Sequence, residues 1–304
     1  MIIFYDYEFN RLLAETKVIS WQLTKYFNGV GTFSAHLPLS SEATRLVAEN
    51  DYLVCKVGDE FMLVTGKEIG NELVIYGRTI NWLLTRRVLL PFSEVTKRTG
   101  EFVQGIFEDA YKDCESVVFG EFYAGDEQSI SCDSPKPLAN VIFDALSLCN
   151  LGNEMVFDTK NRRIVFNILK GEDKNLLISE ANKNASSVKI IQNISEHANL
   201  CYYEGENGYL TAGDGGEGLY RFETCVTSDK EEDAISRLDK MKKENTLNLT
   251  AQGLEYNKDY RLGDTVRLQI IKGDYRTCKR VKIIGVEKSA GPAGYKEMPI
   301  FENV

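Results

Sequence analysis

The sequence has 304 residues, of which 43% are hydrophobic and 11% aromatic, and its 36 Lys and Arg against 45 Asp and Glu give a net charge of −9. This length and composition allow one large domain or two to three smaller ones, and they exclude disorder as the main state. Because the chain is acidic and has two histidines, it is a poor candidate for binding duplex DNA through the phosphates.

The N-terminus lacks the pattern of a secretion signal. Its first twenty residues contain charged side chains that break the apolar core of a signal peptide, namely Asp6, Glu8, Arg11, Glu15 and Lys17. No later stretch approaches the roughly 20 apolar residues of a membrane span. We therefore expect a protein that has no membrane span and is made in the cytoplasm.

Residues 1–92 have the pattern of a β-barrel or sandwich. Short runs of β-branched and aromatic residues are separated by turn signals at 29–31, 58–60 and 70–71. A short helix is expected at 41–48, where Ser40 or Ser41 can cap it. Strands are expected at 18–27, 32–37, 52–57, 61–69 and 72–76.

Residues 93–182 are expected to form a small α/β insertion. A first helix is indicated by apolar residues at helical spacing, namely Val103, Ile106, Phe107, Ala110 and Tyr111. A second apolar stripe occupies 138–149, with Ser134 as the N-cap and Pro135 at the first helical position. Strands at 155–158 and 163–169 are expected to pair.

Residues 183–304 return to the strand pattern, with one helix near 229–244. Ser228 and Glu231 form a capping box for this helix, and Ile235, Leu238 and Met241 mark its buried stripe. The glycine cluster at 213–218 is expected to be a mobile surface loop. Strands are expected at 188–192, 199–204, 209–212, 219–226, 247–252, 265–271 and 280–288.

An internal similarity links the two β regions. The sequence NDYLVCKVGD at 50–59 resembles GDTVRLQI at 263–270, and each leads through a turn with an acidic residue, Asp59 or Asp274. Two barrels of common ancestry would produce this similarity, and so would any two hairpins with polar turns. Both explanations remain open at this point.

The residue types that usually carry chemistry form no recognisable motif. The seven cysteines are scattered, and Cys55, Cys149 and Cys201 lie in apolar patterns that predict buried side chains. His36 and His197 have no Ser or Cys in a nucleophile motif nearby. The glycine cluster lacks a Lys and opens no helix. We therefore expect no catalytic residue, no cofactor and no metal site.

Four motifs, in this order along the whole chain, resemble siphophage tail-hub proteins. They are YDYEFN at 5–10, GTFSAHLP at 31–38, YGRT at 76–79 with LLTRR at 83–87, and YNKDYRLGDTV at 256–266. That family is similar to the structural N-terminal part of tail-associated lysins and to the baseplate hub of contractile-tailed phages.

The resemblance implies an α+β, mainly β fold with two tube-like β-barrels, at 1–92 and 183–304, and the α/β insertion at 93–182 between them. It implies a homotrimer, because three chains with two barrels each match a sixfold tail tube. The ring would join the tail tube to the tail tip of a phage or phage-derived particle. Its partners would be distal tail or tail-tube proteins and a tip or spike protein, while DNA passes without specific binding.

The resemblance also implies a location and the absence of an enzyme. The protein would be made in the host cytoplasm and lie in the virion tail, at the baseplate or tail tip. In this family a hydrolase or receptor binder usually occupies a C-terminal extension or a separate protein. Because the chain stops at Val304, about 40 residues after the LGD motif at 262–264, we expect it to lack a fused lysin.

The motif residues are expected to be structural: Gly31, Phe33, Leu37, Pro38, Gly77, Arg78, Arg86, Arg87, Leu262, Gly263 and Asp264. Gly77 and Gly263 would permit a turn or a close approach of the backbone, and Asp264 would accept backbone hydrogen bonds at a turn. The three arginines would form ion pairs either between subunits or within one subunit, and both alternatives stay open.

Two other functions remain as alternatives. A tail-associated cell-wall hydrolase would use a carboxylate pair that the sequence does not single out. A carbohydrate- or receptor-binding tail protein would line a groove with Trp21 or with Tyr202 and Tyr203, which are otherwise expected in the core or in cross-strand pairs.

Overall fold

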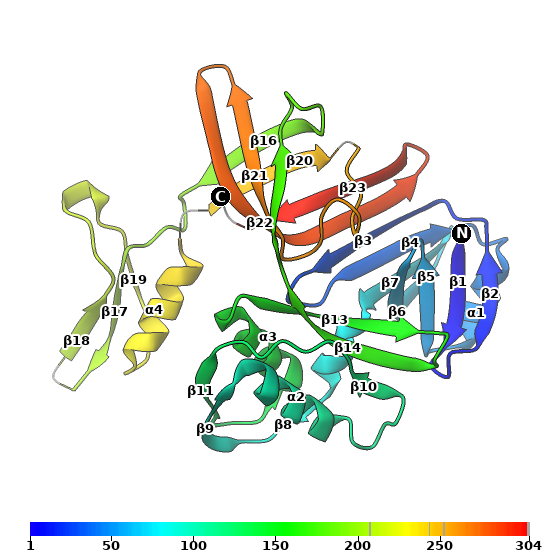
Figure 1. The fold of residues 1–304 in the computed structure, drawn as a ribbon, viewed down its shortest axis with the longest axis horizontal. Helices are drawn as coiled ribbons and strands as arrows, with labels where there is room; N and C mark the ends of the chain where they lie inside the picture. Colours follow the sequence, from blue (N-terminus) through cyan, green and yellow to red (C-terminus); the bar gives the residue numbers. More distant parts are fainter. Residues whose placement is uncertain (207, 243, 252, 303–304) are drawn as a thin grey trace. The chain divides into compact units, whose positions relative to one another are not determined.

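The computed structural model describes residues 1–206, 208–242, 244–251 and 253–302, with about half of them in strands and far fewer in helices (Figure 1). The mainly β character predicted from the sequence is therefore confirmed. Position 207 of the predicted second barrel, position 243 of its helix, position 252 of the strand 247–252 and the last two residues lie outside the described residues.

The chain divides into two compact units. Met1–Ser186 and Thr250–Glu302 form the first unit, and Ser187–Leu249 belong to the second. This division does not test the domain limits predicted at residues 92 and 182, which stay predictions.

A broad sheet forms the centre of the first unit, with strands in the order β15-β21-β22-β3-β4-β7-β6-β5-β1-β2 and with β23 paired to β22. Neighbouring strands are antiparallel, except that β15 and β21 are parallel. The strands are β1 (Ile2–Asp6), β2 (Arg11–Glu15), β3 (Ser20–Tyr26), β4 (Thr32–Leu37), β5 (Leu53–Val57), β6 (Glu60–Ile69), β7 (Leu73–Thr79), β15 (Asp173–Ile178), β21 (Thr265–Lys272), β22 (Tyr275–Gly291) and β23 (Gly294–Phe301).

The pairing of β22 with β3 brings the two predicted β regions into one sheet. The path of this sheet ends at β15 and β2, so within the described residues it is not a closed barrel. The predicted pair of barrels is therefore not confirmed. The similar sequences at 50–59 and 263–270 lie in the β5–β6 and β21–β22 hairpins of this sheet, and their common ancestry stays a prediction.

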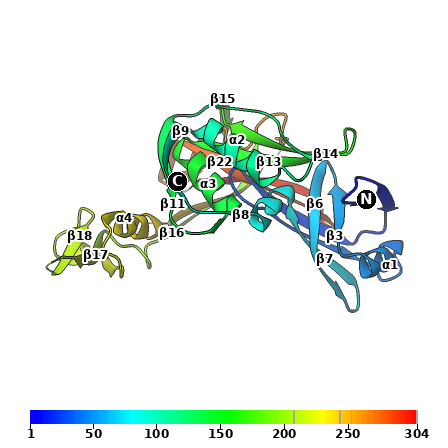
Figure 2. The same ribbon diagram turned by 90° about the horizontal axis from the view of Figure 1, so that it is seen from below.

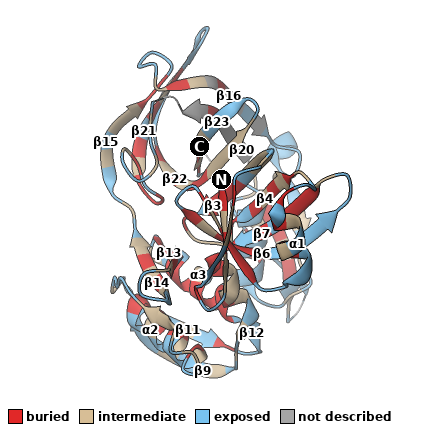
Figure 3. Cartoon of the chain, turned by 90° about the vertical axis from the view of Figure 1, so that its right-hand side faces the viewer, coloured by how far each residue is buried: buried red, intermediate tan, exposed pale blue. Residues whose placement is uncertain are grey.

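The predicted hairpins of residues 18–37, 52–69 and 61–76 and the short helix predicted at 41–48 are confirmed. Alternation explains how β4 forms, because Phe33, Ala35 and Leu37 face inward while the residues between them are more exposed. Helix α1 (Glu42–Glu49) contacts β2 and β6, and its Ala43 and Val47 are buried. Figure 2 shows α1 near the N-terminus. Buried residues alternate with more exposed ones along these strands, and the tips of the β5–β6 and β6–β7 hairpins, at 58–59 and 70–71, are exposed (Figure 3).

The helices α2 (Thr99–Ala110) and α3 (Leu138–Leu148) and the 3₁₀ helix η1 (Ile80–Arg86) share a second core in this unit with the sheet β10-β14-β13. Both predicted apolar stripes are largely buried, as Val103, Phe107, Ile142 and Leu146 show. The strands here are β8 (Val88–Leu89), β9 (Phe92–Arg98), β10 (Val117–Phe119), β11 (Glu127–Cys132), β12 (Lys136–Pro137), β13 (Leu151–Asp158) and β14 (Arg163–Lys170).

The predicted start of α3 is wrong. The helix begins at Leu138, with Pro137 rather than Ser134 at its N-cap, and Pro135 precedes it. The reason is tertiary: Lys136 and Pro137 pair with β8, which holds this segment extended before the helix starts. The predicted pairing of the strands at 155–158 and 163–169 is confirmed by β13 and β14.

The second unit contains a three-stranded sheet in the order β18-β17-β19 and one helix. Its small core includes Cys201, Tyr203, Ala212 and Ala234. The elements are β17 (Leu200–Gly205), β18 (Gly208–Ala212), η2 (Gly218–Tyr220), β19 (Glu223–Cys225) and α4 (Glu231–Lys240), and the strands β16 (Ala185–Asn193) and β20 (Glu244–Ala251) pair with each other.

Three predictions for this unit need correction. The strand predicted at 219–226 shortens to Glu223–Cys225, because a 3₁₀ turn occupies Gly218–Tyr220. Helix α4 is confirmed, but Lys230 is its N-cap, since the Ser228 hydroxyl bonds Asp233 instead of closing a capping box. Ala234 is buried, Leu238 and Met241 are partly buried and Ile235 is exposed, so Ala234 takes the place of Ile235 in the predicted stripe.

Candidate functional site

Four charged side chains form a buried cluster, here named the ionic junction: Lys25 of β3, Glu60 of β6, Glu154 of β13 and Lys288 of β22. The Lys25 Nζ lies 2.7 Å from Glu60 Oε2 and 2.6 Å from Glu154 Oε1, and the Lys288 Nζ lies 2.8 Å from Glu60 Oε1. The side chains of Lys25, Lys288 and Glu60 are only 11%, 11% and 10% exposed. The Glu154 side chain is 28% exposed, and the burial of the other three makes each of their charges depend on its partners.

Two tyrosines of the loop before β21 close the junction. The Tyr256 ring centre lies 4.5 Å from the Lys288 Nζ and 5.6 Å from the Lys25 Nζ, at cation–π distance. The Tyr256 backbone N–H donates to Glu297 Oε1 at 2.6 Å, and the Tyr260 hydroxyl donates to the same oxygen at 3.0 Å. Burial raises the pKa of both phenols above the usual value, so both hydroxyls stay neutral.

The charges of the junction stabilise one another against burial. Desolvation alone would lower the pKa of Lys25, but the carboxylates of Glu154 and Glu60 outweigh it and raise that pKa. Desolvation alone would raise the pKa of Glu60, but the ammonium groups of Lys25 and Lys288 hold it below its usual range. The ionic junction thus joins charged residues from all three predicted segments of the chain, 1–92, 93–182 and 183–304, in one network of ion pairs.

The junction is expected to make stability depend on pH in acid. Because the folded-state pKa of Glu60 is below the unfolded value of about 4.3, its contribution is present above that pH and is lost as the pH falls through the folded pKa. The raised pKa of Lys25 acts oppositely: its contribution is present below about pH 10.4 and is lost only as the pH rises through the folded pKa.

Thermal unfolding from about pH 3 to about pH 8 checks this expectation. The wild type should lose stability below about pH 4, whereas Glu60→Gln should lack that part of the loss. Parallel curves for the two proteins would contradict the assigned role of Glu60.

The sequence contains an indication of the ionic junction that is not among the expectations above. Lys25 shares the inward side of its strand with Leu23 and Phe27, and Glu60 shares the inward side of β6 with Met62 and Val64. A charged residue at an inward position needs a partner. The identity of that partner depends on strand pairings between distant segments, which periodicity does not specify.

Two of the motif glycines, Gly31 and Gly77, lie where a side chain would overlap the backbone. A Cβ on Gly31 would overlap the Thr24 carbonyl, and a Cβ on Gly77 would lie 2.5 Å from the Leu63 carbonyl oxygen and 2.9 Å from the Phe33 ring. Phe33 and Leu37 are buried in β4, and the Pro38 carbonyl accepts a hydrogen bond from the Ser41 N–H at 2.9 Å. Close packing around these motif residues thus leaves no room for a side chain at Gly31 or Gly77.

The turn at Leu262–Gly263–Asp264 holds the start of β21. Gly263 has φ +89°, and a Cβ there would lie 2.7 Å from Cζ of Phe27. The buried Asp264 carboxylate accepts hydrogen bonds at 2.9 Å from the N–H groups of Glu172 and Arg261. The structure thus gives Asp264 the bonds that the expected turn role requires, and Leu262 beside it is buried.

The three motif arginines have different surroundings. Arg87 pairs with Asp113 of the same chain at 3.1 Å, and the Arg86 guanidinium lies 5.3 Å from the Trp82 ring centre. Arg78 is exposed and has no ion pair within the described residues. Arg87 therefore has a partner within the subunit, and a role of Arg78 or Arg86 between subunits stays a proposal.

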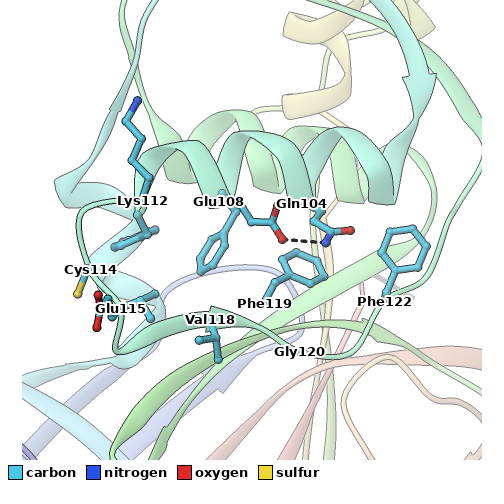
Figure 4. A pocket seen from close by; sticks show the side chains of 12 residues that line it. Gln104, Glu108, Lys112, Cys114, Glu115, Val118, Phe119, Gly120 and Phe122 are labelled. Carbon is cyan, nitrogen blue, oxygen red and sulfur yellow. Dashed lines mark hydrogen bonds between the residues drawn. The ribbon is translucent and has the colours of Figure 1, made fainter.

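A cavity of about 610 Å³ lies between α2 and β10 (Figure 4). Its floor includes Phe107 and Phe119, and on its rim Gln104 Nε2 donates to Glu108 Oε1 at 2.8 Å. No group of three or more His, Cys, Asp or Glu able to hold a metal ion occurs in the described part of the chain. The lining mixes aromatic rings with charged side chains, among them Glu108, Lys112 and Glu115.

The remaining candidate residues have structural surroundings. Cys55 and Cys201 are buried, and burial raises the pKa of both thiols, whereas Cys149 is half-buried. His36 Nδ1 lies 2.7 Å from Glu72 Oε1, and His197 Nδ1 lies 3.1 Å from the Met241 carbonyl oxygen. None of these side chains lies beside a nucleophile motif.

The aromatic residues considered for a glycan groove also have partners within the chain. Trp21 packs beside the core and near the Tyr295 ring, with a centroid distance of 6.2 Å. Tyr203 is buried, and the Tyr202 hydroxyl accepts from Arg221 at 2.8 Å. Among the helices that the structure describes, none is long and apolar enough to cross a membrane.

Comparison with known proteins identifies the fold. No family model and no curated protein sequence matches the chain. A tail protein of Neisseria meningitidis MC58 matches with a TM-score of 0.59 and 12% identity, covering 99% of this chain and 96% of that one. A 43 kDa tail protein of prophage MuSo2 from Shewanella oneidensis matches with a TM-score of 0.60 and 12% identity, covering 99% and 98%.

A prophage tail protein of Listeria monocytogenes EGD-e matches with a TM-score of 0.55 and 14% identity, covering 99% of this chain and 94% of that one. A Francisella PdpA–VgrG complex contains a chain that matches with a TM-score of 0.53 and 6% identity; 99% of this chain is covered and 57% of that one. The protein therefore has the fold of phage and prophage tail proteins. The resemblance to tail proteins seen in the sequence motifs is confirmed at the level of fold.

Proposed function

We propose that this protein is a structural hub of a phage or phage-derived tail, which forms a ring of three chains joining the tail tube to the tail tip. The observation that carries the proposal is the fold similarity to tail proteins over nearly the full length of both chains. Similarity of this extent leaves little of the chain for a separate function, although fold alone does not specify a function.

The open sheet of the first unit supports a role in a ring. Its path ends at β15 and β2, and a sheet edge in a soluble protein is usually covered or paired. In the proposed ring, neighbouring chains complete the two tube-like barrels that one chain does not close. Distal tail or tail-tube proteins contact one side of the ring and a tip or spike protein the other, at the baseplate or tail tip of the virion.

Gold-labelled antibodies against the chain, applied to native particles, test its location. Label confined to the distal end of the tail is the expected result, whereas label on the head or along the whole tube would contradict the proposal. We also propose that the chain has no enzymatic activity, and turnover of purified peptidoglycan by the isolated protein would overturn that part.

A further inference from the structure

The β21–β22 hairpin and the turn before it concentrate positive charge in an acidic protein. Residues 261–288 contain eight Arg and Lys and three Asp and Glu, so the net charge of this stretch is 8 − 3 = +5. Since the whole chain has a net charge of −9, the remainder carries −9 − 5 = −14. The hairpin therefore differs in sign from the rest of the molecule.

Strand register places three arginines on one face of this hairpin. Arg267 lies opposite Arg280, and Ile271 lies opposite Arg276. These residues alternate with buried ones on β21, where Val266, Leu268 and Ile270 face the other side. We name the exposed side the arginine face; it consists of Arg267, Gln269, Ile271, Arg276, Cys278 and Arg280.

The arginine face borders a small cavity with an excess of positive charge. A space of about 210 Å³ is lined by Asp173, Lys174, Asn175, Arg267 and Arg280. Arg280 pairs with Asp173, and Lys174 lies 2.5 Å from Glu172. Arg267 donates only to a neutral amide oxygen, that of Asn175 at 2.8 Å, and it has no carboxylate partner within the described residues.

This arrangement favours an external anion. Like charges directly opposite each other on neighbouring strands destabilise a sheet, and Arg267 and Arg280 are such a pair. A carboxylate placed between two guanidinium groups removes the repulsion and accepts bidentate hydrogen bonds. Ile271 and Tyr275, exposed near the hairpin tip, add apolar area beside the charges.

We propose that the arginine face is a contact between copies of this chain, in which an acidic side chain of a second copy binds between Arg267 and Arg280. The inference rests on the proposed function, because a ring brings copies together. The charge of −14 outside the hairpin makes a second copy a complementary partner.

Two native thiols allow a direct test. Cys278 lies on the arginine face, and Cys225 is an exposed thiol of the second unit. Alkylation of both is followed in the free chain over a range of protein concentrations and in purified tail particles. Cys278 should become protected at high concentration and in particles, while Cys225 stays reactive, and protection in the free chain should vanish near 1 M salt, where the Debye length is about 3 Å.

Substitutions of Arg267 and Arg280 show whether a loss of self-association comes from the changed charge or from misfolding. Arg267→Glu with Arg280→Glu should weaken self-association by about 100-fold or more, because close charge pairs at interfaces couple strongly. Arg267→Gln with Arg280→Gln removes charge without adding repulsion and should weaken it less. The matched control is Arg45→Glu on α1, where the arginine is exposed and remote from the hairpin in sequence. Unreactive Cys55 reports that each variant is folded.

The outcomes distinguish this inference from the proposed function. If Cys278 stays reactive in particles that are labelled at the tail tip, the arginine face is not the contact although the hub function stands. If added duplex DNA, rather than protein concentration, protects Cys278, the partner is nucleic acid and the inference is wrong. Unchanged association of the doubly substituted Glu variant would also overturn it.

Discussion

Replacing Glu60 by Gln is expected to lower the free energy of unfolding by about 3 to 5 kcal/mol, the effect of breaking a buried ion pair from one side. The amide keeps the size of the side chain but leaves the ammonium groups of Lys25 and Lys288, each within 2.8 Å of a Glu60 oxygen, without a shared anion. Among the residues that the structure describes, Lys25 keeps another carboxylate, that of Glu154, and Lys288 keeps none. Urea unfolding at neutral pH measures the change.

A matched control is Glu49→Gln. Glu49 pairs with Arg45 on α1, and the two side chains are 60% and 85% exposed. Because exposed pairs contribute about 0 to 1 kcal/mol, the control should change stability little. Equal effects of the two substitutions would show that the ionic junction is no more important than a surface pair.

Gly263→Val is expected to cost at least about 1 to 3 kcal/mol, through backbone strain and overlap with Phe27. The φ of +89° suits glycine, and a Cβ there would lie 2.7 Å from Cζ of the buried Phe27 ring. Asp264→Ala should cost a similar amount, because the N–H groups of Glu172 and Arg261 lose their acceptor.

Gly105→Ala provides the control of opposite sign. A Cβ on Gly105 meets nothing within 4 Å, and the residue lies within helix α2. Alanine there should raise stability by about 0.4 to 1 kcal/mol. Thermal unfolding of the three variants measures these changes. An unchanged midpoint for both Gly263→Val and Asp264→Ala would contradict the stabilising role of the turn at 262–264.

Local features of the fold could be predicted from the sequence. Alternation in β4 and helical spacing in α2 are properties of short segments, and so is the turn chemistry of Gly263 and Asp264. Non-local features could not be predicted in this way. The pairing of β22 with β3 joins segments about 260 residues apart, and nothing in either segment specifies the other.

The candidate site shows the same division. Lys25 and Lys288 lie within predicted strands, whereas Glu60 falls in the predicted turn at 58–60 and Glu154 just before the strand predicted at 155–158. Their burial depends on β3, β6, β13 and β22 meeting. The predicted start of α3 is wrong for a related reason. Lys136 and Pro137 pair with β8, and this pairing outweighs the local capping signal at Ser134. Tertiary contacts decided both cases.

A reconstruction of the native tail tip tests the central claim most directly. The account predicts a threefold ring of this chain with a channel wider than duplex DNA, roughly 20 Å or more. The channel should be lined by more Asp and Glu than Lys and Arg, since an acidic lining avoids tight contacts with phosphates. A hub that is not threefold, or a channel lined chiefly by Lys and Arg, would contradict the account.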